Sequence, residues 1–140
     1  MDKNNITNKL IDQLYILYTS KNMSNFFEFS QGEKKALLEL NLSEKDITPT
    51  DLGKKLNVSK QRITFIINSL KEKKYITLQI DDNDRRRIII KLSKSGKKYI
   101  EKESELILNE VKKKLEKITV EELEQLTNIL SKFNDLINED

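Results

Sequence analysis

The sequence contains no cysteine, no histidine and no tryptophan. Because cysteine is absent, the chain can form no disulfide and cannot sense oxidants through a thiol. Because histidine is absent, it lacks the side chain that most often acts as a general acid or base near neutral pH. Neither residue is available as a metal ligand. We therefore predict a protein that is not an enzyme and has no catalytic residue, metal site or cofactor.

Glycine, proline and long apolar runs are also scarce. The three glycines lie far apart, so no glycine-rich loop is available to hold a phosphate. Residues 2–5 are polar, and no apolar stretch after them is long enough for a signal peptide or a membrane span. We expect a single-domain cytoplasmic protein with no membrane contact. Abundant Lys, Ile and Asn are typical of an AT-rich bacterial genome.

Charge is distributed unevenly along the chain. Residues 54–98 contain fourteen Lys or Arg and four acidic residues, a net charge of +10. The whole chain carries +3, so the remaining residues sum to −7. A basic middle between acidic ends is typical of a surface that binds nucleic acid.

A β-hairpin is predicted within this basic segment. Residues 75–80 and 87–92 are rich in β-branched side chains, and the turn formers at 81–84 separate them. Arg85, Arg86 and Arg87 fall at or near the tip. We expect all three guanidinium groups to extend outward and to bind an anion. The alternative is a solvated turn whose charges are balanced by Asp81, Asp82 and Asp84.

A helix-turn-helix is predicted immediately before the hairpin. Thr48 has the character of an N-cap, Pro49 suits the first helical position and Asp51 suits the first turn. Ser59 can cap a second helix, whose apolar face comprises Ile63, Ile66, Ile67 and Leu70. Its outward side chains can hydrogen-bond to phosphates and base edges. These side chains are Lys60, Gln61, Arg62, Thr64 and Asn68.

Over nearly its whole length the chain resembles the multiple-antibiotic-resistance regulator (MarR) family of dimeric winged-helix transcription factors. The matching motifs are Leu52-x-x-x-Leu56-x-Val58-Ser59, Asp84-x-Arg86 and Leu92-Ser93-x-x-Gly96. The resemblance implies that Arg86 enters the DNA minor groove, that Asp84 holds it in place and that residues 59–64 face the major groove. The predicted DNA-binding residues are Ser59, Lys60, Gln61, Arg62, Thr64, Asn68, Asp84, Arg85, Arg86 and Arg87.

The sequence departs from the family pattern at two positions. Phe65 stands where relatives usually have an arginine, so one polar contact to DNA is missing, and Arg62 is the candidate to replace it. Lys74 stands where a glycine usually ends the recognition helix. A non-glycine residue there costs about 1 kcal/mol if its backbone is left-handed.

The remaining segments predict amphipathic helices. One runs from about Ile6 to Lys21, another starts with capping-box spacing at Ser30, and Ser93 and Thr119 begin the last two. The predicted fold is mainly α with a small β-hairpin wing. It is a single domain, 1–140, with a winged helix-turn-helix lobe at 30–93 and a helical dimerisation lobe formed by 4–29 and 94–140. A three-helix subcore within a monomer is the alternative to a dimer.

Aromatic residues cluster where the first helix leads into the DNA-binding lobe. The resemblance implies a site there for a small aromatic or anionic effector, lined by Tyr15, Tyr18 and Phe29, with Phe26 and Phe27 nearby. The alternative is an ordinary aromatic core.

The predicted function is a homodimeric, sequence-specific DNA-binding transcriptional regulator, a repressor that responds to a small-molecule effector. It would bind a pseudo-palindromic promoter site. Two alternatives differ in class. One is an architectural binder of AT-rich DNA, and the other is a protein-interaction module that uses Phe65.

Overall fold

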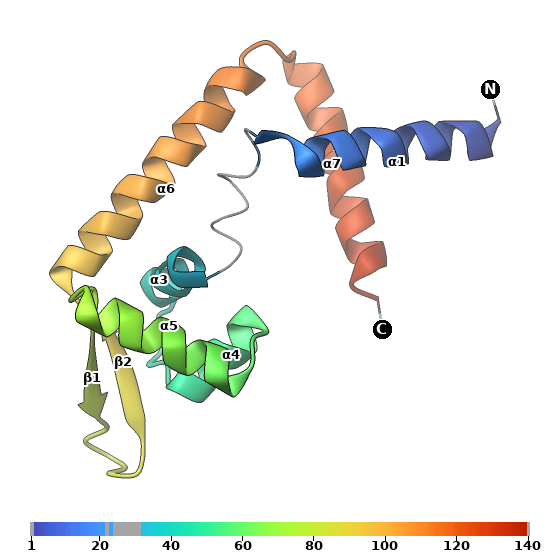
Figure 1. The fold of residues 1–140 in the computed structure, drawn as a ribbon. Coiled ribbons are helices and arrows are strands. Elements are labelled where there is room, and N and C mark those ends of the chain that lie inside the picture. The colour runs from blue at the N-terminus through green and yellow to red at the C-terminus, as the bar shows by residue number, and fades with distance from the viewer. Residues whose placement is uncertain (1, 22, 24–31, 140) are drawn as a thin grey trace. The chain divides into compact units, whose positions relative to one another are not determined.

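The computed structural model describes residues 2–21, 23 and 32–139. It is mainly helical with one two-stranded antiparallel sheet, as the sequence predicted (Figure 1). The elements, in order, are α1 (Lys3–Thr19), α3 (Gly32–Leu42), α4 (Pro49–Leu56), α5 (Lys60–Glu72), β1 (Ile76–Ile80), β2 (Ile88–Leu92), α6 (Lys94–Leu115) and α7 (Val120–Ile137). The chain divides into two compact units, Met1–Ser104 and Glu105–Asp140.

The first helix is displaced from its predicted bounds of 6 and 21. It begins at Lys3 because the Asp2 carboxylate accepts a hydrogen bond from the Asn5 backbone N–H at 2.8 Å and caps the helix. It ends at Thr19, whose hydroxyl donates to the Tyr15 carbonyl. The apolar pattern on which the prediction rested contains no information about such a cap. The start predicted at Ser30 lies outside the described residues.

Side-chain caps fix the helix-turn-helix as predicted. The Thr48 hydroxyl accepts from the Asp51 N–H at 3.1 Å, and the Asp51 carboxylate accepts from the Thr48 N–H at 3.2 Å. This backbone hydrogen bond, followed by the one with the Thr48 side chain, lowers the pKa of Asp51. Asn57 ends α4 in the left-handed conformation, and Ser59 caps α5 by accepting from the Arg62 N–H at 3.1 Å. Two successive caps therefore set the tight turn between α4 and α5.

The core of the first unit lies among α3, α4, α5, the hairpin and the start of α6. Its largest fully buried side chains are Leu37, Leu52, Ile66, Leu70, Ile76 and Ile100. Burial of each contributes about 1.5–3 kcal/mol. Because Ile100 is fully buried, the first turns of α6 pack with the winged helix-turn-helix. The sequence analysis, by comparison, placed the whole of residues 94–140, including these first turns of α6, in the helical dimerisation lobe.

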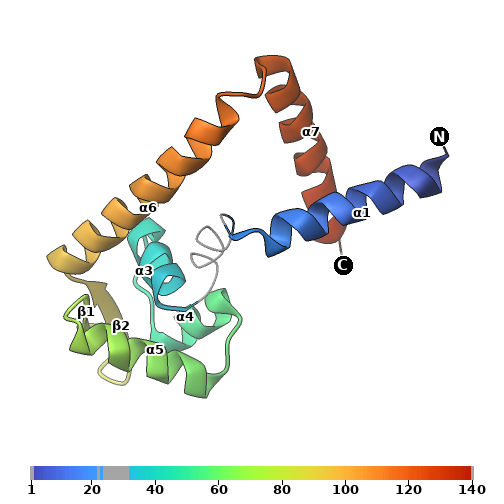
Figure 2. The same cartoon turned by 45° about the horizontal axis from the view of Figure 1, so that its top comes forward.

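The hairpin is anchored to the segment that leads into α4. Its register pairs Ile76 with Leu92 and Ile80 with Ile88. The Ile90 N–H donates to the Ile47 carbonyl at 2.9 Å, which forms an isolated one-residue antiparallel bridge beside β2. Beside it, the Lys91 ammonium pairs with Asp46 at 2.8 Å. These contacts hold the hairpin against the segment that leads into α4, in the same compact unit as α5 (Figure 2).

The junction between α5 and β1 has the left-handed backbone considered for Lys74, whose φ is +63°. The Lys74 carbonyl accepts hydrogen bonds from the hydroxyls of Ser93 at 2.7 Å and Ser95 at 3.0 Å. The Tyr75 ring stacks on Tyr99 of α6, with 4.7 Å between ring centroids. The start of α6 therefore stabilises a backbone conformation that a lysine adopts only at a cost.

We predict that Lys74→Gly raises the free energy of unfolding by up to about 1 kcal/mol, because glycine adopts a left-handed φ without steric strain. Lys71→Gly, three residues earlier within α5, is the matched control. It should lower the free energy of unfolding by about 1 kcal/mol, since glycine is unfavourable inside a helix. Urea unfolding followed by circular dichroism measures both. Equal destabilisation by the two substitutions would contradict this account of Lys74.

The helices at the two ends of the chain present apolar side chains that this chain leaves exposed. Neither α1 nor α7 contains a buried residue. On α7 the exposed large apolar side chains are Val120, Leu126, Ile129, Leu130, Phe133, Leu136 and Ile137. The predicted capping box of Thr119 and Glu122 begins this helix. Among the described helices, none combines the length and the apolar character that a membrane span requires.

Candidate nucleic-acid interface

The outward face of α5 carries the side chains predicted to contact DNA. Successive residues of an α-helix are rotated by about 100°. The buried stripe of α5 comprises Ile63, Ile66, Ile67 and Leu70. On this geometry Gln61, Phe65 and Asn68 lie at the centre of the opposite face, while Thr64 and Arg62 lie on its two flanks. All five, together with Ser59 and Lys60, are exposed.

Two hydroxyls on this face are oriented by the helix itself. The Ser59 hydroxyl accepts from the Arg62 N–H, so its own hydrogen remains free to donate to an oxygen of a ligand. The Thr64 hydroxyl donates to the Lys60 carbonyl at 2.8 Å, so its oxygen remains an acceptor. The two side chains can therefore make opposite kinds of hydrogen bond.

Arg62 lies at the edge of this face rather than at its centre. Its guanidinium carbon is 5.8 Å from the centroid of the Phe65 ring, within cation–π range. The beginning of α3 lies on the side of Arg62 away from the Phe65 ring. Burial raises the pKa of Glu33 there, but hydrogen bonds from Lys73 and Ser69 and the charges of Lys73 and Arg62 outweigh burial and lower it. The Lys73 ammonium is 2.6 Å from the Glu33 carboxylate.

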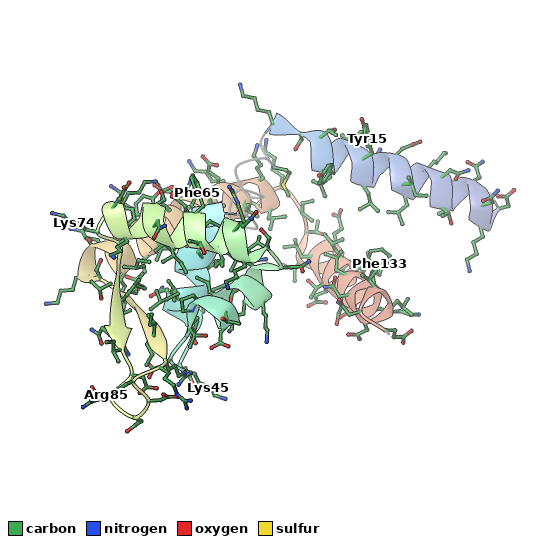
Figure 3. All side chains as sticks on the ribbon, turned by 60° about the horizontal axis from the view of Figure 1, so that its bottom comes forward. Tyr15, Lys45, Phe65, Lys74, Arg85 and Phe133 are labelled. Atoms are coloured by element: carbon green, nitrogen blue, oxygen red, sulfur yellow. The ribbon has the colours of Figure 1, made fainter. Side chains whose placement is uncertain are left out.

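Phe65 has a place on this face that the sequence analysis did not foresee. The sequence analysis treated it as the loss of a polar contact to DNA or as part of a protein-interaction surface, and the structure shows it 65 % exposed near the centre of the outward face of α5 (Figure 3). The signal that could have located it is its spacing, four residues after Gln61 and three before Asn68. An aromatic side chain between two amide side chains is therefore the central feature of α5.

The loop of the hairpin is tied together at its base by Asp81. The Asp81 N–H donates to the Arg87 carbonyl at 2.9 Å, and its carboxylate accepts from the Asn83 N–H at 3.0 Å and pairs with the Arg87 guanidinium at 3.2 Å. The expectation that all three arginines extend outward therefore needs correction for Arg87. The return of the chain brings Arg87 opposite Asp81, a pairing that adjacency in sequence does not reveal.

Asp84 contacts Arg86, as the family resemblance implied. The Asp84 carboxylate accepts from the Arg86 backbone N–H at 3.0 Å and from its Nε at 3.4 Å. The Arg86 side chain is nevertheless 93 % exposed, and Arg85 lies beside it at the loop tip (Figure 3). Arg86 also lines a shallow hollow that it shares with Thr50 at the start of α4. Asp84 thus holds the backbone and the Nε of Arg86, while the side chain projects into solvent.

Sequence comparison relates part of the chain to a known family. Residues 32–87, which contain the helix-turn-helix and most of the wing, match the MarR family. This part of the chain is similar to the MarR family. The chain is 29% identical over 94 residues to the HTH-type transcriptional regulator YcgE of Bacillus subtilis. The aligned region covers 67% of the chain and 61% of YcgE. The resemblance to the MarR family inferred from sequence motifs is confirmed.

Solved structures show the same fold. A MarR family protein from Bacillus stearothermophilus superimposes with a TM-score of 0.76 at 18% identity, with 99% of each chain covered. MepR, a transcription regulator of the Staphylococcus aureus multidrug efflux pump MepA, superimposes with a TM-score of 0.69 at 19% identity, with 99% of this chain and 100% of its own covered. The predicted winged-helix fold is confirmed. Similarity to MarR family regulators over residues 32–87 supports a DNA-binding transcriptional regulator.

The residues predicted to line an effector site lie partly outside the described structure. Tyr15 and Tyr18 are on α1, where they are 68 % and 69 % exposed. Phe29, with its neighbours Phe26 and Phe27, lies outside the described residues. The effector site therefore stays a prediction.

Proposed function

We propose that the protein is a homodimeric, sequence-specific DNA-binding regulator that places α5 in the major groove and the hairpin loop in the minor groove. The observation that carries this proposal is the arrangement of Arg86, whose backbone and Nε are held by Asp84 while its side chain projects into solvent. A preordered arginine loses less conformational freedom on binding than a mobile one. It suits the negative potential of a narrow, AT-rich minor groove.

Each predicted DNA-binding residue has a role that follows from its chemistry. We assign base-edge contacts to Gln61 and Asn68, since amide side chains pair with adenine through two hydrogen bonds. Lys60, Ser59 and Thr64 are placed to bind phosphates, which position the protein on the duplex. Arg85 adds a phosphate contact from the loop tip. Arg87 acts mainly through Asp81, by shaping the loop that presents Arg86.

The exposed apolar side chains of α1 and α7 support a homodimer. Neither of these two amphipathic helices has a buried residue within one chain. A second copy of the chain could cover their apolar side chains. Two recognition helices about 34 Å apart would then bind successive half-sites of a pseudo-palindromic promoter. A variant of MepR has been solved bound to an oligodeoxyribonucleotide. The fold of that structure is similar to this chain, with a TM-score of 0.58.

Repression relieved by an effector is the form of regulation that we propose. A dimer bound to a promoter blocks access to it, and a ligand that changes the separation of the two α5 helices weakens binding. MepR has been solved with ethidium bromide, an aromatic cation, at a TM-score of 0.59 to this chain. Tyr15, Tyr18 and Phe29 remain the proposed lining of a site for a small aromatic or anionic effector, in a protein that acts in the cytoplasm.

We predict that Arg86→Ala weakens DNA binding by about 1–3 kcal/mol, the usual value of a specific groove contact. Fluorescence anisotropy with a duplex selected from a random pool measures the affinity. Lys102→Ala is the matched control, because it removes the same charge from an exposed position on α6 outside the proposed interface. Its effect should be much smaller. If folded Arg86→Ala protein binds with unchanged affinity, the assignment of the wing is wrong.

A further inference from the structure

We propose that Phe65 recognises the 5-methyl group of a thymine in the major groove, and so makes the protein select A·T pairs at one position of each half-site. This inference rests on the proposed function and names the chemistry of base recognition within it. Apolar contact with the thymine methyl group is a recognised means by which a phenylalanine distinguishes bases.

The position of Phe65 supports contact with a base rather than with the DNA backbone. It lies opposite the buried stripe of α5, at the centre of the face that a major groove would receive. Phosphates lie along the rims of the groove, so residues on the flanks of the helix meet them first, whereas a central residue points toward base edges. A phenyl ring has no hydrogen-bonding group, so the thymine methyl is the feature it can contact favourably.

The two neighbours of Phe65 on this face complement that choice. Gln61 and Asn68 carry amide groups, which pair with the N6 and N7 positions of adenine. Adenine presents these atoms in the same groove in which its partner thymine presents the methyl group. An amide–phenyl–amide arrangement therefore matches a short A·T-containing sequence, with the amides on adenines and the ring on a thymine methyl.

Arg62 restricts where the ring can lie. Its guanidinium is 5.8 Å from the ring centroid, and its charge also acts on Glu33 at the start of α3. The Arg62 cation lies on the side of the Phe65 ring that faces α3. Its attraction to the ring favours a position in which the remaining surface of the ring stays exposed. Arg62 thus serves as a positioning residue for Phe65, in addition to any contact of its own.

A protein partner fits this surface less well than DNA does. Phe65 is the one large apolar side chain that α5 exposes, and the structure describes the whole of this helix. Its neighbours on the face are amide, hydroxyl and cationic side chains. The centre of a protein interface usually has several apolar residues and few charges, whereas a single apolar residue among polar and cationic ones is suited to one methyl group in a charged groove.

The test uses the full-length protein and a duplex enriched from a random pool. Each thymine is replaced in turn by deoxyuridine, which removes only the methyl group. At one thymine in each half-site we expect the replacement to weaken wild-type binding about fourfold, the effect of losing one buried methyl group. Phe65→Ala should weaken binding to the thymine duplex to a similar extent and should bind the thymine and uracil duplexes equally.

Two further variants make the result specific. Leu42→Ala removes an equally exposed apolar side chain, 68 % against 65 %, at the end of α3, and it should retain the wild-type preference for thymine. Phe65→Leu keeps an apolar group and should retain part of the preference. The inference is overturned if no thymine methyl affects wild-type binding, or if Phe65→Ala retains the full preference. Both outcomes leave the proposed function intact, whereas failure to enrich any duplex overturns the function and the inference together.

Discussion

Gly96→Ala is expected to destabilise the protein by about 3 kcal/mol, the upper end of the cost of overpacking a well-packed site. A Cβ atom at residue 96 would lie 2.1 Å from the Tyr75 carbonyl oxygen and 3.0 Å from the Leu92 side chain. Backbone atoms cannot move aside as a side chain can. The Ser93 N–H donates to this same Tyr75 carbonyl at 2.9 Å, so any shift would also weaken the link between β2, β1 and α6.

Urea unfolding of the full-length protein tests this prediction. Gly53→Ala is the matched control, since its Cβ would lie 3.5 Å from the nearest atom of Ile63, an ordinary contact distance. Alanine is also favoured over glycine within a helix by about 1 kcal/mol, so the control should be neutral or stabilising. A Gly96→Ala protein as stable as the control would show that α6 does not pack closely against Tyr75.

Leu130→Asp or Phe133→Asp is expected to convert the protein to a folded monomer that no longer binds a duplex with two half-sites. Both residues lie on the α7 stripe that includes Leu123, Leu126 and Ile137. Within a single chain they are 46 % and 43 % exposed, so the substitutions should not disrupt a core. In a dimer the new carboxylate would be desolvated without a partner, which costs about 3–5 kcal/mol.

Sedimentation and a binding titration with the two-half-site duplex follow the effect. Asn128→Asp is the control, because helix geometry places residue 128 on the opposite side of α7 and the position is exposed. It should remain dimeric and bind normally. If Leu130→Asp stays folded and monomeric yet binds the full site with native affinity, the dimer is not required and this part of the proposed function is wrong.

The features that the sequence predicted correctly are those that depend on nearby residues. Thr48, Ser59 and Thr119 each cap a helix through a hydrogen bond with a backbone N–H three residues on, so the sequence alone contains both partners. The hairpin likewise follows from turn formers between two β-branched segments. The left-handed Lys74 could be anticipated because the family motif requires a chain reversal at that position.

The features that the sequence could not predict depend on tertiary packing. Ile47 forms a one-residue bridge to Ile90, too short to produce a periodic pattern. Arg87 pairs with Asp81 only because the loop brings its two ends together. Arg62 lies near both the Phe65 ring and the beginning of α3, which is distant in sequence, and its predicted contact with DNA remains a prediction.

Selection of bound sequences from a random duplex pool tests the central claim most directly. The account predicts two inverted half-sites about 10 base pairs apart, with A·T pairs at the positions contacted by α5. Gln61→Ala should change the enriched bases, while Lys60→Ala should weaken binding evenly across sequences. Enrichment of no sequence, with bound DNA displaced equally well by unrelated duplex, would identify an architectural binder and contradict a sequence-specific regulator.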